Sequence, residues 1–320
     1  MIDISKGKFW DKPWSLVDGC TPCSPGCEHC WAAAMERRFG HLAEKVGNNP
    51  PRFTGVINTN SERLSIPLKR RKPTVYAVWN DLFHEAVPGD FINHAWMTMR
   101  NADKHTFLIL TKRPEKMLSW TKISALYKTW PIDEIWPENV YLGLTVCNQQ
   151  EADEKIPVFL QVPGKKFLSI EPMLGAIELR HLFNYCPEHD FPGGFCLQRR
   201  HDGVQWIDAV ILGGETGPGT RPLHPDWVRS VRDQCAAAAV PFFLKSLGEW
   251  SLRGNMKTGC EYIHSKDGRL LDGRTHDDLP WRKRTCRVCG CTDERACEGG
   301  CSWVPDPEGG DLCSRCAEGK

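Results

Sequence analysis

The stretch TFLILTKRPEKMLSWTKIS (residues 106–124) joins a short apolar segment to a polar triplet and then to a longer segment of mixed character. Residues 106–110 are apolar on both faces, which is typical of a parallel strand that is covered on both sides. Residues 114–124 have the pattern of a helix. The stretch therefore predicts a buried strand followed by a helix, which is the repeating unit of α/β proteins.

The same alternation recurs along the chain. The strands that we expect lie at residues 15–19, 74–79, 106–110, 140–144, 166–170, 208–212 and 240–244. The helices that we expect lie at residues 31–46, 91–101, 114–124, 149–160 and 225–239. Seven such strands favour a TIM-like parallel barrel, complete or partial, over a five-stranded doubly wound sheet. Residues 181–205 have no clear periodicity and are expected to form a loop insertion in this α/β domain.

The composition is that of an ordinary soluble globular protein, with 41% hydrophobic and 25% charged residues among 320. The formal net charge of +1 gives no overall attraction to nucleic acid or to a membrane surface. The first residues lack the apolar segment of a signal peptide, and no run reaches the roughly 18 apolar residues of a membrane helix. We therefore expect a cytoplasmic protein without membrane contact, in a compartment that keeps thiols reduced.

Sixteen cysteines in a reducing compartment indicate metal binding rather than a disulfide framework. The first group has the spacing Cys20-x2-Cys23-x3-Cys27-x2-Cys30. A zinc site made of two CxxC pairs normally has a dozen or more residues between the pairs, and a bacterial ferredoxin has its gaps in another order. The subset from Cys23 to Cys30 has the spacing of radical S-adenosylmethionine enzymes and lies where they carry it, before the first helix. A zinc or purely structural role is the alternative.

Three thiolates suit the chemistry of those enzymes. They hold three irons of a [4Fe–4S] cluster and leave the fourth iron open for the amino and carboxylate groups of S-adenosylmethionine, whose cleavage releases a 5′-deoxyadenosyl radical. A fourth thiolate on the open iron would block this reaction. Either Cys20 or Cys23 is therefore expected to stand off the cluster, while Cys27 and Cys30 bind it.

The chain also resembles a family of phage-associated, radical-SAM-like proteins of unknown function, over roughly residues 10–250. The matching stretches are GCTPCSPGCEHCWA, NDLFHEAVP, LTKRPE, LSIEPMLG, GGETGPGTRPLHPDWVRSVRDQC and PFFLKSLGEW. The first motif of that family often reads Cys-x6-Cys-x2-Cys, which implies Cys20, Cys27 and Cys30 as ligands, whereas general radical-SAM spacing selects Cys23. The resemblance further implies a phage or prophage protein in a bacterial host cell, with a flavodoxin or ferredoxin-like electron donor.

Polar residues follow the expected strands at their carboxyl ends, where the chemistry of a barrel takes place. We expect cofactor-binding groups at Asn80, Asp81, Thr111, Glu171, Gly213, Gly214 and Glu215. We expect substrate-binding groups at Lys112, Arg113 and Lys245. Residues 213–215 resemble the GGE motif with which many radical-SAM enzymes hold the methionyl amine, but here they follow the sixth strand instead of the second. Capped loops and salt bridges are the structural alternative, and no residue is assigned as catalytic.

Residues 281–320 are expected to form a small cysteine-rich module after a first domain at 1–280, too poor in apolar residues to fold without a metal. The pairs Cys286-x2-Cys289 and Cys313-x2-Cys316 are 23 residues apart and predict a zinc-ribbon-like site. Three further cysteines could bind a second zinc with a shared thiolate, or an auxiliary iron–sulfur cluster; they are Cys291, Cys297 and Cys301.

Together these patterns predict a radical S-adenosylmethionine enzyme that modifies or repairs a nucleotide or nucleic acid. The nucleic-acid part depends on the family resemblance, on basic runs such as residues 69–72 and on the zinc ribbon. One alternative is a non-catalytic zinc protein that binds nucleic acid or another protein. Another is a radical-SAM enzyme that modifies a peptide and carries an auxiliary cluster. No residue pattern identifies the substrate or the product.

Overall fold

The computed structural model describes residues 2–45, 47–124, 136–179, 206–217, 219–255, 259–264, 268–282, 286–292, 295–304 and 311–319. The insertion expected at 181–205 lies outside these residues. The main element is a seven-stranded sheet whose neighbouring strands all run parallel. Its strands are β1 (Lys12–Ser15), β6 (Val75–Trp79), β7 (Thr106–Thr111), β8 (Val140–Thr145), β9 (Lys165–Ile170), β10 (Ala209–Gly213) and β11 (Phe242–Ser246).

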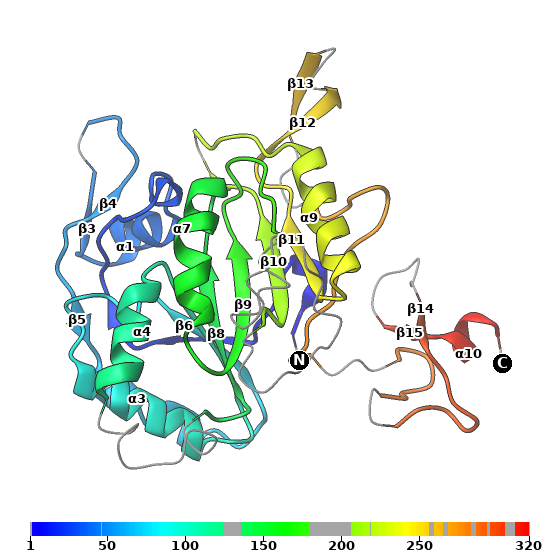
Figure 1. Cartoon of the computed structure of the whole chain (residues 1–320), viewed down its shortest axis with the longest axis horizontal. Coiled ribbons are helices and arrows are strands. Elements are labelled where there is room, and N and C mark those ends of the chain that lie inside the picture. Colours follow the sequence, from blue (N-terminus) through cyan, green and yellow to red (C-terminus); the bar gives the residue numbers. More distant parts are fainter. Residues whose placement is uncertain are drawn as a thin grey trace, which may run out of the picture.

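The strands lie in the sheet in the order β1-β6-β7-β8-β9-β10-β11, so each new strand is added to the same edge. A barrel is built in this way, whereas a doubly wound sheet reverses its direction of growth at a switch point. β1 and β11 are the two edges of the sheet, which is a parallel half-barrel (Figure 1). The doubly wound alternative is therefore excluded.

The first strand begins earlier than the sequence predicts. The apolar pattern places it at 15–19, but β1 covers Lys12–Ser15, and Val17–Asp18 forms a separate strand, β2. Lys12 and Pro13 are exposed because β1 is an edge strand, so the apolar signal covers only its second half. Trp14 anchors the strand, since it is 1% exposed and its indole donates to the carbonyl of Arg63 at 2.9 Å.

Helices connect most of the parallel strands. Those between strands of the main sheet are α1 (Trp31–Phe39), α2 (Ile66–Lys69), α3 (Gly89–Asn101), α4 (Pro114–Ile123), α7 (Gln149–Leu160) and α9 (Pro225–Ala237), with the 3-10 turns η2 (Pro25–Cys27) and η3 (Ser61–Arg63). The turn η1 (Ile4–Lys6) precedes the sheet, and α10 (Ser314–Ala317) lies in the cysteine-rich module. The helix expected at 31–46 ends at Phe39. There the Glu36 carboxylate accepts the amide hydrogens of His41 and Leu42 at 3.0 and 3.2 Å, which stabilises the non-helical chain that follows.

Four two-stranded antiparallel sheets complete the described structure. They pair β2 with β5 (Asn58–Thr59), β3 (Ala43–Glu44) with β4 (Arg52–Phe53), β12 (Trp250–Asn255) with β13 (Gly259–His264), and β14 (Trp303–Val304) with β15 (Leu312–Cys313). The last pair belongs to the cysteine-rich module, which lies beside the half-barrel in Figure 1. None of the helices in the described part of the chain has the length and apolar character that a membrane crossing requires.

The two faces of the main sheet are covered differently. On one face, residues such as Phe107 and Leu168 belong to the larger apolar cluster, which also contains side chains of α3, α4, α7 and α9. On the inner face, Tyr141 and Phe167 belong to a second cluster with Trp281, whose ring lies 5.0 and 5.4 Å from theirs. Tyr141 and Phe167 lie in the amino-terminal halves of β8 and β9, so apolar side chains fill that half of the inner face.

We predict that Trp281→Ala destabilises the half-barrel, although residue 281 follows the last strand of the sheet. The indole is 8% exposed and donates to the carbonyl of Phe9 at 2.9 Å, so truncation leaves a cavity and an unpaired carbonyl. The expected loss is about 3–5 kcal/mol in the free energy of unfolding, measured with urea. Leu270→Ala, at a side chain that is 60% exposed, is the control. A loss below about 1 kcal/mol for Trp281→Ala would contradict this packing.

Candidate functional site

The loop that carries the first four cysteines lies over the carboxyl ends of the parallel strands. It runs from β2 through η2 to α1, and Ser24 caps η2 by accepting the amide hydrogen of Gly26 at 3.2 Å. A side chain at Gly26 would strike Cys147 and Pro172, which follow β8 and β9. This close approach requires glycine and holds the loop against the middle of the half-barrel, with Cys30 directly before α1.

Arg113 ties the cysteine loop to the sheet. Its guanidinium is buried and donates to the carbonyl and hydroxyl oxygens of Thr21, both at 2.9 Å. The same group donates to Asp81 at 2.7 Å and to Glu85 at 2.8 and 3.0 Å. All three guanidinium nitrogens have partners within the protein, so in this structure the residue holds the loop. Its expected role as a substrate ligand stays a prediction.

Two residues expected to bind a cofactor, Asp81 and Thr111, contact one another. The Thr111 hydroxyl donates to Asp81 at 2.7 Å, while the amide of Phe83 donates to the same carboxylate oxygen at 3.0 Å. Asn80, which precedes them, has a left-handed backbone with φ 59° and donates its side-chain amide to the carbonyl of Val17 at 2.7 Å. These groups therefore build a hydrogen-bonded support beneath the cysteine loop.

A second arginine, Arg221, holds the other side of the cysteine loop. It donates to the carbonyl of Pro25 and to Glu28, both at 3.0 Å. It is also paired with the buried carboxylate of Glu215, which accepts the Arg221 backbone amide at 2.8 Å. Arg221 could not be predicted as a contact of this loop, because no motif links it to residues almost two hundred positions earlier.

Close packing explains why both glycines of the GGE stretch lack a side chain. A side chain at Gly213 would approach the Glu171 carboxylate to 2.8 Å, and one at Gly214 would strike the backbone of Leu247 and Gly248. Glu171 also forms an ion pair with Lys245 at 2.9 Å, which joins the ends of β9 and β11 across β10. Three residues that the sequence predicts as site residues therefore lie together in one polar region of the half-barrel; they are Glu171, Gly213 and Lys245.

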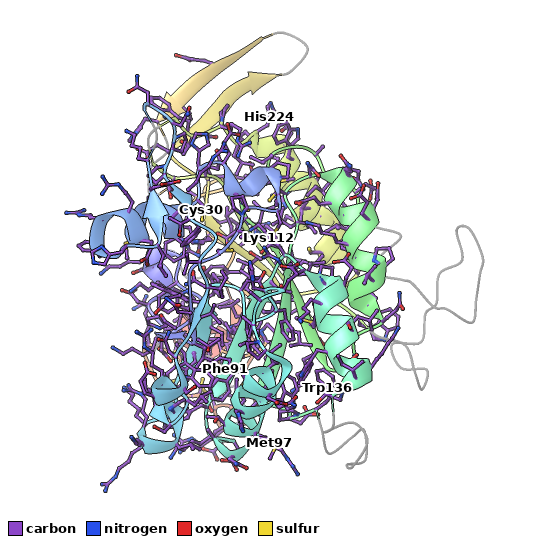
Figure 2. The ribbon with its side chains drawn as sticks, turned by 90° about the vertical axis from the view of Figure 1, so that its left-hand side faces the viewer. Cys30, Phe91, Met97, Lys112, Trp136 and His224 are labelled. Carbon is purple, nitrogen blue, oxygen red and sulfur yellow. The ribbon has the colours of Figure 1, made fainter. Side chains whose placement is uncertain are left out.

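Lys112, which follows β7, is a positively charged residue with sulfurs of the cysteine loop around it. Figure 2 labels it together with Cys30. The pKa of Cys27 is lowered to about 5, and that of Cys23 is raised, because the Cys23 thiol donates a hydrogen bond to Cys27. Burial and the nearby Asp81 carboxylate raise the pKa of Cys20 to about 11. Burial opposes the charge of Lys112, but its pKa is raised, with Cys147, Cys27 and Cys30 among the sulfurs around it.

Cys147, at the end of β8, is a site residue that the sequence analysis did not find. Its side chain is buried, and its sulfur lies 3.6 Å from the hydroxyl of Ser24. Burial raises the pKa of this thiol to about 11, so it is protonated at neutral pH. An isolated cysteine after a strand carries no recognisable spacing, and only the loop that folds over it places it in the site.

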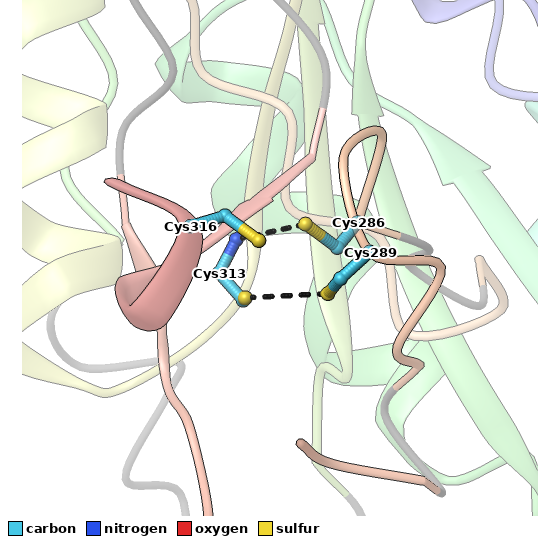
Figure 3. A group of neighbouring side chains, drawn as sticks. All are labelled: Cys286, Cys289, Cys313 and Cys316. Atoms are coloured by element: carbon cyan, nitrogen blue, oxygen red, sulfur yellow. Dashed lines mark hydrogen bonds between the residues drawn. The ribbon is translucent and has the colours of Figure 1, made fainter. Parts of the chain in front are cut away.

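The second group of cysteines forms the tightest cluster of sulfur atoms in the described structure. The cysteines of the two CxxC pairs face one another, with all four sulfurs within 4.8 Å (Figure 3). Cys289 and Cys313 have sulfurs 3.7 Å apart, and the amide of Cys313 donates to the sulfur of Cys286 at 3.4 Å. This arrangement can hold a metal ion such as zinc, as the sequence predicts, and the auxiliary iron–sulfur cluster stays the alternative.

The first four cysteines are arranged more loosely. Among the residues that the structure describes, groups of three or more metal-binding side chains with ligand atoms within 4.8 Å occur only in the cysteine-rich module. A single zinc ion needs such closeness, because its thiolate ligands all lie about 2.3 Å from one centre. An iron–sulfur cluster is a larger body and needs more widely spaced thiolates.

A family model described as a protein of unknown function (DUF5131) matches residues 5–280. No curated protein and no solved structure matches the chain. The matched residues include the half-barrel, the cysteine loop and both arginines that hold it. The cysteine-rich module follows the matched part.

We predict that Arg113→Lys loosens the cysteine loop. Lysine keeps one charge but cannot reach Thr21, Asp81 and Glu85 together, so buried hydrogen-bonding groups lose their partners. The expected loss is about 1–3 kcal/mol in the free energy of unfolding, together with faster alkylation of Cys27 and Cys30. Arg71→Lys, at an exposed position, is the matched control. Unchanged stability and alkylation rates in Arg113→Lys would show that the loop does not depend on this contact.

Proposed function

The chain belongs to the DUF5131 family of proteins of unknown function, and we propose that it is a radical S-adenosylmethionine enzyme. One observation carries the proposal: a loop with four cysteines lies at the carboxyl end of a parallel half-barrel, directly before the first helix of the chain. The carboxyl ends of barrel strands are where the chemistry of such folds takes place. The polar strand ends around the loop could position a cofactor and a substrate.

The residues of this loop fit a [4Fe–4S] cluster. Thiolates are the ligands that iron–sulfur clusters require, and the hydrogen bond from the Cys23 thiol lowers the pKa of Cys27, which favours its thiolate form. Cys27 and Cys30 would be two ligands, and Cys20 or Cys23 the third. The looser spacing of these cysteines, compared with the cysteine-rich module, favours a cluster over a single zinc ion. When bound, the cluster would supply the electron that cleaves S-adenosylmethionine.

Other residues of this chain have chemistry that suits the cofactor. Lys112 lies among the loop sulfurs with a raised pKa, and its ammonium group would bind the carboxylate of the cofactor. The Glu171 carboxylate, held by Lys245 at 2.9 Å, could accept a hydrogen bond from an ammonium group or a ribose hydroxyl. Three other residues would not touch the cofactor but would hold the loop that binds the cluster; they are Asp81, Thr111 and Arg113.

A nucleotide or nucleic acid is the substrate class that we propose. Trp31 and Trp79 lie edge to face at 5.0 Å, next to Cys30 and at the carboxyl end of β6, and Trp31 is 49% exposed. Exposed aromatic rings are surfaces on which nucleobases stack. The basic run at 69–72 does not contribute, because it precedes the amino end of β6, away from the cysteine loop.

The proposed activity predicts that the reduced protein cleaves S-adenosylmethionine to 5′-deoxyadenosine and methionine. The assay uses anaerobically reconstituted protein with dithionite in place of a flavodoxin or ferredoxin-like donor. Cys27→Ala and Cys30→Ala should each lose the N-terminal iron and the product, because only two of the three cluster ligands remain. Cys235→Ala, at a buried cysteine of α9, is the control and should keep both.

A fully loaded and reduced N-terminal cluster that forms no 5′-deoxyadenosine would contradict the proposal. Zinc in place of iron and sulfide at the loop would favour a non-catalytic zinc protein. The assay is then repeated with nucleotides, DNA, RNA or peptides added. The substrate is the added molecule that speeds cleavage of S-adenosylmethionine and whose mass changes in the reaction. Acceleration by a peptide alone would support the peptide-modifying alternative and overturn the proposed substrate class.

The cluster also predicts different roles for Cys20 and Cys23. An open iron needs three protein ligands, so only one of the substitutions Cys20→Ser and Cys23→Ser should abolish formation of 5′-deoxyadenosine. The other should keep about the full iron and sulfide content and the activity. Iron content, the spectrum of the reduced cluster and product formation are measured together for both variants. Equal loss in both variants would mean that all four cysteines bind the metal and that no iron is open.

A further inference from the structure

The seven cysteines of the C-terminal module form one continuous group of sulfurs. Two sets of four can each surround a metal ion, the first made of Cys286, Cys289, Cys313 and Cys316, and the second of Cys289, Cys291, Cys297 and Cys313. The two sets share Cys289 and Cys313, so the sulfurs of these two cysteines lie between the two candidate metal positions. Cys301 lies beside the second set, with its sulfur 3.7 Å from that of Cys291.

The distances match those of tetrahedral metal sites. Four thiolates about 2.3 Å from a zinc ion lie about 3.8 Å from one another. The sulfur of Cys289 is 3.5 Å from that of Cys297 and 3.7 Å from that of Cys313, while Cys297 and Cys313 are 3.8 Å apart. Sulfurs on both sides of Cys289 are therefore at the spacing that a shared ligand requires.

The number of cysteines fits two metal ions. Two tetrahedral ions need about eight metal–sulfur bonds, and seven thiolates provide eight when one of them bridges. We propose that the module holds two zinc ions, joined by the thiolate of Cys289. The first ion is bound by Cys286, Cys289, Cys313 and Cys316, and the second by Cys289, Cys291, Cys297 and Cys301. This proposal does not depend on the proposed radical chemistry.

Cys289 and Cys313 both lie between the two sets, and we assign the bridge to Cys289 because its sulfur lies closer to the second set. Its sulfur contacts the second set through Cys297 at 3.5 Å, closer than the 3.8 Å contact that Cys313 makes there. With Cys313 bound to the first ion, Cys301 takes its place as the fourth ligand of the second ion, and the amide of Cys297 donates to the Cys301 sulfur at 3.3 Å. Backbone amides that donate to metal-bound sulfur stabilise the thiolate form, and the amide of Cys313 does the same for Cys286 in the first set at 3.4 Å.

The packing of the module explains why two ions are needed. Its buried core consists of Cys286, Cys291, Cys313 and Leu312, so the cysteines themselves occupy the place of apolar side chains. A core of this kind gains its stability from the metal, since a small cysteine-rich unit rarely folds without it. One ion on the first set would leave Cys291, Cys297 and Cys301 as closely spaced thiols that no metal crosslinks.

The test counts zinc per chain by native mass spectrometry, using the full chain with Cys27→Ser and Cys30→Ser so that the N-terminal loop contributes no metal. We expect two zinc ions, and one after the further change Cys301→Ser. Cys235→Ser, outside the module, should keep two. A count of one before the Cys301 change, or iron and sulfide in the module, would overturn the proposal. Two ions retained in Cys301→Ser would mean that Cys313 also bridges and would overturn the single bridge.

The bridge itself is tested by replacing zinc with cadmium-113. Two ions joined through one sulfur should give two nuclear magnetic resonance signals that are split by coupling to each other. Cys289→Ser should remove the coupling and loosen one of the ions, whereas Cys316→Ser should affect the first ion and leave the second in place. Two signals without mutual coupling in the parent chain would contradict a bridging thiolate.

Discussion

The buried guanidinium of Arg113 is the interaction on which the geometry of the cysteine loop depends. It joins Asp81, at the end of β6, to Thr21, which lies between Cys20 and Cys23. A buried arginine without its carboxylate would be strongly destabilising, so the pair constrains the loop and the sheet to one arrangement. Arg221 holds the other side of the cysteine loop in the same way, by donating hydrogen bonds to Pro25 and Glu28. The cysteines are thus presented by a rigid support, which a metal centre requires.

The half-barrel has two different ends. At the amino ends of the strands, Trp281 packs on Tyr141 and Phe167, so that end of the inner face is filled. At the carboxyl ends the residues are polar, and the ion pair of Glu171 with Lys245 lies there with the cysteine loop. One end of the half-barrel is therefore filled with apolar side chains. The opposite end carries polar groups that could bind a cofactor or a substrate.

Much of the fold could be predicted from the sequence because buried parallel strands are short apolar runs. β7, β8 and β9 lie within a residue or so of their expected positions. The first strand was placed wrongly, because Lys12 and Pro13 lie at an exposed edge and give no apolar signal. The site was harder to predict. Residue types at strand ends indicated polarity, but whether Asp81 meets Arg113 or a ligand depends on side-chain geometry that no spacing encodes.

The GGE stretch illustrates the same limit. By sequence it suggests a cofactor-binding turn, yet in the fold Gly213 makes room for Glu171, and Glu215 is paired with Arg221. Cys147 is the opposite case, a residue without any motif that the loop brings into the site. In both cases the decisive partner is distant in sequence, and only tertiary contacts identify it.

The central proposal is that the N-terminal cysteine loop holds a [4Fe–4S] cluster with an open iron that binds S-adenosylmethionine. Electron–nuclear double resonance on the reduced cluster, with the cofactor labelled by nitrogen-15 at its amino group and oxygen-17 at its carboxylate, tests this directly. The account predicts hyperfine coupling of both labels to the cluster spins, and loss of that coupling in Cys27→Ala. A fully loaded cluster that shows no coupling to either label would contradict it.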